Sequence, residues 1–205
     1  PVSFQLPRGA WGYPAANATK RNRIWDEHKL YFIELFHFLR SHPSVPQALR
    51  SEAQSLGLCK DEYVDSENWP PQLYIRESIR LLGEVVLTQK DVIGSSEQRQ
   101  KASSIGLGSW FVDLHTSERV ALRDDTGSYF VQNLGQVNSG QVDANGHEIP
   151  RHFEVFEIPY ESLVPRKADC ENLLVPVCIS ASRVAFSAFR LETQFMIAGQ
   201  AAGVA

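Results

Sequence analysis

The chain has 205 residues and a formal net charge of −4, with 43% apolar and 21% charged side chains. This length allows one large domain or two small ones. No apolar run approaches the roughly 20 residues that a membrane-crossing helix needs, and the arginines are scattered instead of forming one stripe. We therefore expect neither a membrane span nor nucleic-acid binding. Cytoplasmic and secreted locations stay equally open.

The three cysteines say little about compartment, since an odd number leaves at least one unpaired within the chain. They form neither a C-x-x-C pair nor a zinc spacing with histidine, so no metal site is predicted. Cys178 lies in an apolar run and is expected to be a buried thiol packed like a small hydrophobe.

The N-terminal third predicts a helical hairpin. Residues 1–20 carry prolines, glycines and aromatics without a period, which indicates an extended leading segment. Apolar side chains at helical spacing predict a long, well-buried helix over 22–40. A shorter helix is expected over 46–56, with Pro46 in its first turn and Gly57 at its C-terminal cap.

Residues 73–88 are ambiguous between two structures. Apolar and polar side chains alternate along them, which favours a strand bent at Gly83. A helix would instead place Arg76 and Arg80 on one face. We predict the strand.

A short helix should follow. Thr88 and Asp91 have the spacing of a capping box, so a helix is predicted over 89–93. The polar residues 94–104 after it are expected to form a loop.

The middle of the chain predicts an antiparallel sheet. Residues 105–115, 127–134 and 152–160 are rich in β-branched and aromatic side chains. Turn sequences at Asp124–Gly127 and Asp143–Gly146 separate them.

The C-terminal stretch has the order strand, small-residue loop, helix. The apolar run 173–179 contains Pro176 and predicts a strand covered on both faces. Residues 180–182 are small enough to bring backbone N–H groups close to a ligand. Glu192 or Thr193 can cap the helix that begins nearby. Such a helix start can receive an anionic or carbonyl-rich ligand.

This stretch and three blocks before it resemble FAD-dependent oxidoreductases. The four blocks occur in the family's order, namely Trp69 to Glu84, Ile105 to Trp110, Glu157 to Pro165 and Glu171 to Gly203. Four separated blocks are far more specific than one short motif. They resemble the C-terminal half of a flavoenzyme, so the resemblance implies FAD as the cofactor and a small-molecule substrate.

The resemblance implies an α+β fold in three segments. Residues 1–68 would hold the leading segment and helical hairpin, 69–165 an antiparallel β substrate or cap region, and 166–205 the last strand and helix of an incomplete FAD-binding Rossmann-like domain. The flavin would lie against the strand end and the start of the last helix. The implied cofactor-binding residues are Cys178, Ile179, Ser180, Ala181, Ser182, Glu192, Thr193, Gln194 and Phe195.

The glycine-rich turn that holds the FAD pyrophosphate is missing. None of the 13 glycines falls in a G-x-G-x-x-G pattern, because Gly106 and Gly108 lack a third glycine three residues on. Both ends look cut, and an N-terminal FAD-binding half is the expected partner. Alone, the chain should hold FAD weakly or not at all.

Three residues are candidates for catalysis. His115 follows Asp113 in a block that looks like the family's Asp-x-His segment, and it could take a proton from a substrate hydroxyl, or be structural. Arg76 belongs to the family's Arg-Glu dipeptide and could line the substrate or join a buried ion pair. Arg190 could stabilise the reduced ring, anchor a substrate, or pair with Glu192 or another acid.

Two positions depart from the family's pattern. The family commonly has the sequence Ser-Ala-Ser-His, and in this chain Arg183 takes the place of the histidine. Any contact made by that histidine is therefore changed or lost. The segment 191–194 replaces the usual Met-Glu-Pro. Both departures bear on whether the chain is active.

Three functions are therefore compared. The first is flavin-mediated hydride transfer from a small organic substrate, such as a hydroxylated one. The second is a non-catalytic binding or scaffold domain derived from the same family. The third, a carbohydrate-active hydrolase or lyase, needs paired carboxylates, and no spacing of the acids singles out such a pair.

Overall fold

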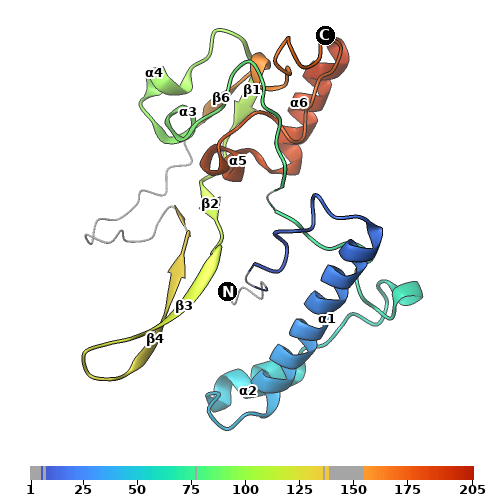
Figure 1. The fold of residues 1–205 in the computed structure, drawn as a ribbon, viewed down its shortest axis with the longest axis vertical. Coiled ribbons are helices and arrows are strands. Elements are labelled where there is room, and N and C mark those ends of the chain that lie inside the picture. Colours follow the sequence, from blue (N-terminus) through green and yellow to red (C-terminus); the bar gives the residue numbers. More distant parts are fainter. Residues whose placement is uncertain (1–5, 7, 77, 136, 139–154) are drawn as a thin grey trace. The chain divides into compact units, whose positions relative to one another are not determined.

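The computed structural model describes residues 6, 8–76, 78–135, 137–138 and 155–205 and divides the chain into two compact units, Pro1–Ile75 and Arg76–Ala205 (Figure 1). The α-helices are α1 (Ala18–Ser41), α2 (Gln47–Ser55), α3 (Gln89–Ile93), α4 (Ser96–Arg99), α5 (Arg183–Phe189) and α6 (Glu192–Val204). The strands are β1 (Ser104–Gly108), β2 (Asp113–Leu114), β3 (Glu118–Arg123), β4 (Tyr129–Leu134), β5 (Val137–Asn138) and β6 (Phe156–Pro159). Two 3₁₀ turns, η1 (Val64–Ser66) and η2 (Tyr160–Ser162), complete the description. The α+β class is confirmed.

The first unit contains the predicted helical hairpin. Helices α1 and α2 pack together, and the Arg40 guanidinium of α1 donates to the carbonyls of Ala53 (2.9 Å) and Leu56 at the end of α2. Pro46 is the N-terminal cap of α2 and not part of its first turn, and Leu56, not Gly57, is its C-terminal cap. Arg40 therefore satisfies carbonyls that the helix end leaves open.

Two expectations for the first unit are wrong. Only Ile24 and His28 of α1 are buried, so the helix is not well buried. Its apolar side chains spread around the helix, and α2 packs against one side of it only. The described part of the leading segment is not extended either. It runs through successive turns, in which the amides of Gly9, Trp11 and Tyr13 each donate to the carbonyl of the residue three positions earlier.

The second unit has one hydrophobic core around the antiparallel pair β1–β6. Helix α3 contacts β6, α6 contacts β1, and α5 contacts both α3 and β2. Phe156 and Ile158 of β6 and Phe189 of α5 are fully buried. Gly108 lies so close to Phe156 that an added Cβ would stand 2.3 Å from its ring. Segments 69–165 and 166–205 therefore share this core.

The predicted antiparallel sheet is wrong as a single sheet, since the described strands form three separate pairs, β1–β6, β2–β5 and β3–β4. The span 105–115 divides into β1 and β2. The charged strand β3 is a further difference from the prediction, and it pairs with β4. The expected turn joins the two strands, and in it Asp124 Oδ1 accepts hydrogen bonds from the amides of Thr126 and Ser128 (both 2.9 Å). The other predicted turn, Asp143–Gly146, and the start of 152–160 lie outside the described residues.

The two predicted strands at 73–88 and 173–179 are also wrong. The first makes only isolated bridges, Leu87 with Ala181 and Gly83 with Pro165. In the second, Leu173 and Val177 are half exposed, because no strand of the described residues lies beside it to cover both faces. Pro176, which lacks an N–H, does not support a continuous ladder there.

Helix α3 confirms the predicted capping box, since the N–H and hydroxyl of Thr88 both donate to the Asp91 carboxylate (2.6 Å each). The loop predicted over 94–104 is wrong in part, because Ser95 and Gln98 form a second capping box that starts α4. Helix α5 was also missed.

Candidate functional site

Residues 178–182, which are predicted to bind the cofactor, are held in place by backbone hydrogen bonds to other segments of the second unit. Among them, the amides of Ser180 and Ser182 donate to the carbonyls of Ser162 and Leu87 (2.8 Å each). The carbonyls of Ser180 and Cys178 accept from Leu87 and Leu81. The amides of 180 and 182 are therefore used inside the fold and do not cradle a ligand.

Side chains of the same segment differ sharply in exposure. Ile179 and Ser180 are fully buried, whereas Cys178 is exposed, so the expectation of a buried Cys178 thiol is wrong. The physical reason is that 173–179 lies open on one side and is not a covered strand. Ser182 caps α5, with its hydroxyl accepting the Ala185 amide (3.2 Å).

The Ser180 hydroxyl is an unusual group for the interior. Its Oγ is buried and has no hydrogen-bond partner within the described part of the chain. A buried polar atom without a partner costs about 1–3 kcal/mol. A hydrogen-bonding group would satisfy this hydroxyl, and because Ser180 is fully buried such a group reaches it only when neighbouring residues move.

The start of α6 has no side-chain cap. Its N-terminal cap, Leu191, offers no side-chain hydrogen bond, so capping by Glu192 or Thr193 is wrong; both residues lie exposed in the first turn. Phe195 is half-buried and packs edge-to-face on Phe189, with ring centroids 5.5 Å apart. Gln194 is buried, and with its amide nitrogen facing the end of α5 it donates to the carbonyls of 188 and 189.

The structure brings two predicted catalytic residues together around Asp113, at the start of β2. Arg190 Nη2 donates to the Asp113 backbone carbonyl and to its Oδ2, at 3.1 Å each. His115 Nε2 lies 3.2 Å from the same Oδ2. Arg190 is buried, and the side chains of Asp113 and His115 are each 25% exposed. The sequence left open an ion pair between Arg190 and an acid, and that acid is Asp113.

Two further arginines, which sequence reasoning did not select as site residues, support this region. Arg183 Nη2 donates to the His115 carbonyl (3.2 Å), so the arginine that departs from the family's pattern holds the backbone of the His115 segment. Arg80 Nε donates to the Ala181 carbonyl (2.9 Å) and lies over the ring of Phe186, 5.5 Å from its centroid. Long-range contacts of this kind leave no signal in residue spacing. Arg76 is half-buried at the start of the second unit.

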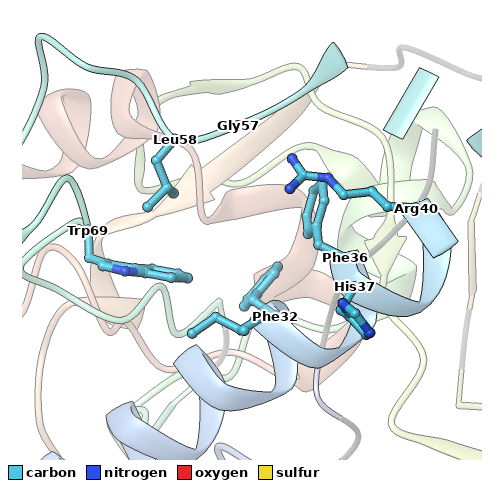
Figure 2. A pocket seen from close by; sticks show the side chains of 8 residues that line it. Phe32, Phe36, His37, Arg40, Gly57, Leu58 and Trp69 are labelled. Carbon is cyan, nitrogen blue, oxygen red and sulfur yellow. The ribbon is translucent and has the colours of Figure 1, made fainter. Parts of the chain in front are cut away.

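The first unit has a cavity of its own, of about 400 Å³ (Figure 2). The side chains around it are mostly apolar, and none of them was predicted as a site residue. It is lined by Phe32, Ile33, Phe36, His37, Arg40, Gly57, Leu58 and Trp69. Figure 2 shows Phe36 and Arg40 of α1 on one side of the cavity and Leu58 and Trp69 on the other. Arg40 is occupied in holding the end of α2, as described above.

The described residues contain no group of three or more histidine, cysteine or acidic side chains placed to hold a metal ion. None of their helices combines the length and apolarity that crossing a bilayer requires.

Comparison with known families agrees with the resemblance drawn from the sequence. The model of the family described as FAD dependent oxidoreductase matches residues 4–205. The match covers nearly the whole chain, so the chain belongs to the FAD-dependent oxidoreductase family. No curated protein and no solved structure matches it.

Proposed function

We propose that this chain is the C-terminal portion of an FAD-dependent oxidoreductase, which transfers a hydride to flavin from a small organic substrate such as one bearing a hydroxyl group. The observation that carries the proposal is membership of the family over residues 4–205. When bound, FAD would supply the two-electron acceptor, which is chemistry that amino-acid side chains lack.

The fit of the flavin ring is supported by two features. The buried Ser180 hydroxyl lacks a partner among the described residues, so a carbonyl or ring nitrogen of the cofactor would satisfy it. The first turn of α6 has no side-chain cap, and the amides of Gln194 and Phe195 there donate to the Leu191 carbonyl. The two amides before them, at 192 and 193, are suited to a carbonyl-rich edge. Glu192 already places negative charge in that turn, which favours a polar carbonyl there over a full negative charge.

The pyrophosphate requires a different segment. The described loop over 180–182 uses two of its amides internally, and the sequence lacks a G-x-G-x-x-G turn. We therefore assign the pyrophosphate to a dinucleotide-binding segment outside this sequence. Residues 166–205 would join that Rossmann-like domain through α5 and α6, without the strand expected at 173–179. Residues 69–165 would shape the substrate side, and 1–68 would form an accessory hairpin.

The residues around Asp113 suit the substrate side of the reaction. The partly exposed imidazole of His115 can accept the hydroxyl proton as hydride leaves the adjacent carbon, which turns an alcohol into a carbonyl compound. Arg190, fixed by Asp113, places a positive charge near that proton transfer. Arg76 is assigned to the same side of the site from the family's Arg-Glu motif alone.

Visible absorption tests the proposal. The chain is expressed as one longer protein that includes its upstream coding sequence. The visible spectrum of this longer protein is recorded beside that of the 205 residues alone. Flavin bands in the longer protein only are expected. Absence of flavin from both proteins, after incubation with FAD, would overturn the proposal and favour a non-catalytic binding domain.

A further inference from the structure

Asp113 Oδ2 lies between two side chains, the guanidinium of Arg190 and the imidazole of His115. Arg190 Nη2 lies 3.1 Å from this oxygen, and His115 Nε2 lies 3.2 Å from it on another side. A guanidinium has no acceptor, so it fixes Oδ2 as an acceptor. Carboxylate oxygens only accept hydrogen bonds. The hydrogen between Oδ2 and the imidazole must then belong to Nε2.

We infer that Asp113 is a positioning residue, which holds His115 in the tautomer with hydrogen on Nε2 and leaves Nδ1 as the atom that accepts a proton. The tautomer itself follows from the geometry around Asp113. Its use in substrate oxidation rests on the proposed function.

The surroundings of both residues keep this pair in place. The Asp113 amide donates to Ser187 Oγ of α5 (3.3 Å), and Arg190, which follows α5, holds the Asp113 carbonyl. Arg183 of α5 holds the His115 carbonyl. One helix and its C-terminal cap therefore fix the backbone at both ends of the Asp-x-His segment.

The other ring nitrogen remains available for chemistry. Within the described residues, the Asp113 carboxylate is the only hydrogen-bond partner of the His115 ring. The side chain is 25% exposed, so a small molecule can reach it. A neutral imidazole with hydrogen on one nitrogen is an acceptor at the other, which is the state that a general base requires.

Nitrogen NMR of the 205-residue chain labelled with ¹⁵N-histidine reads the tautomer without any flavin. The His115 signals are identified as those absent from His115→Gln. At a pH where the ring is neutral, the wild-type chain should show hydrogen on Nε2 and an unprotonated Nδ1. Hydrogen on Nδ1 in the wild-type chain would overturn the inference, whether or not the chain binds FAD.

Three variants separate positioning from packing. Asp113→Asn should keep the wild-type tautomer, because Arg190 can only donate and will hold the amide oxygen in the place of Oδ2. Asp113→Leu removes the acceptor, so the two nitrogen shifts should move towards the averaged values of free histidine. Ser187→Ala disturbs the same backbone without removing the carboxylate and should leave the shifts unchanged. Identical nitrogen shifts in the wild type and in Asp113→Leu would contradict the inference. If Asp113→Leu does not fold, the test is Asp113→Asn, in which loss of the wild-type tautomer would contradict the inference.

Discussion

Arg190 donates from a single nitrogen to both the backbone carbonyl and the carboxylate of Asp113, at 3.1 Å each. Because Arg190 follows α5 and Asp113 begins β2, this contact ties a helix end to a strand that is only two residues long. The Arg190 side chain is 6% exposed, so the charge is held largely away from water. The contact therefore has a structural role whether or not Arg190 also meets a substrate.

Replacing Arg190 should destabilise the second unit. Arg190→Leu leaves the Asp113 carboxylate without its cation, and a broken buried pair costs about 3–5 kcal/mol. Asp113 is 25% exposed and can regain water, so we expect a loss of about 2 kcal/mol in the free energy of unfolding, measured by urea denaturation. Arg166→Ala is the control, since its exposed pair with Asp169 should contribute under about 0.5 kcal/mol. Equal effects of the two variants would contradict the account.

Two glycines should respond to alanine in opposite directions. At Gly108 a new Cβ would stand 2.3 Å from the fully buried Phe156 ring, so Gly108→Ala should cost about 1–3 kcal/mol. At Gly199, in the middle of α6, no heavy atom of the described residues beyond the neighbouring helix backbone lies within 4 Å of the new Cβ, so Gly199→Ala should stabilise by about 0.5–1 kcal/mol. Thermal unfolding of the two variants checks the signs. A stabilised Gly108→Ala would contradict the described packing of β1 on β6.

Asp91 should make stability depend on acid pH. Burial raises the pKa of its carboxyl, but hydrogen bonds from Lys101 and Thr88 outweigh burial and hold the pKa below its usual value of 3.8. Because the folded pKa is depressed, the stabilisation is present above the unfolded pKa and is lost as pH falls through the folded pKa. Urea midpoints measured from about pH 6 to about pH 2 should therefore fall less steeply for Asp91→Asn than for the wild type. Parallel curves would show that the carboxylate at the start of α3 does not contribute.

Ser180 should affect stability and cofactor binding in opposite senses. Ser180→Ala removes a buried hydroxyl that has no partner among the described residues, so the FAD-free chain should gain up to about 1 kcal/mol. In the longer protein the same change should weaken FAD binding about tenfold, which corresponds to one lost hydrogen bond of about 1.4 kcal/mol. Isothermal titration with FAD and urea denaturation measure the two effects. Ser182→Ala is the contrast, since it removes the cap of α5 and should cost about 1 kcal/mol of stability.

Local signals in the sequence predicted local structure well. The capping box of Thr88 and Asp91 and the turn at 124–127 are satisfied by atoms a few residues apart, so their spacing carries enough information. The same reasoning applied to Ser95 and Gln98 would have found α4. The strands expected at 73–88 and 173–179 are absent because a strand depends on a distant neighbour. Among the described residues, 73–88 makes only isolated bridges and 173–179 lies in no strand.

The site was predictable by residue type but not by arrangement. The family's Asp-x-His pattern pointed to His115, yet its relation to Arg190 depends on a contact 77 positions apart along the chain. The role of Arg183 in holding the His115 carbonyl is likewise a product of tertiary structure. Burial of Ser180 beside an exposed Cys178 also follows from the packing of its neighbours, which a run of apolar letters does not reveal.

Hydrogen exchange with and without FAD tests the central claim most directly. The longer protein is loaded with FAD and compared with its FAD-free form by mass spectrometry of peptides. We expect added protection in peptides covering 178–182 and 192–195, above all at the first amides of α6, which no side chain caps. Binding of FAD with no change in either segment would contradict the proposal that this chain holds the flavin ring.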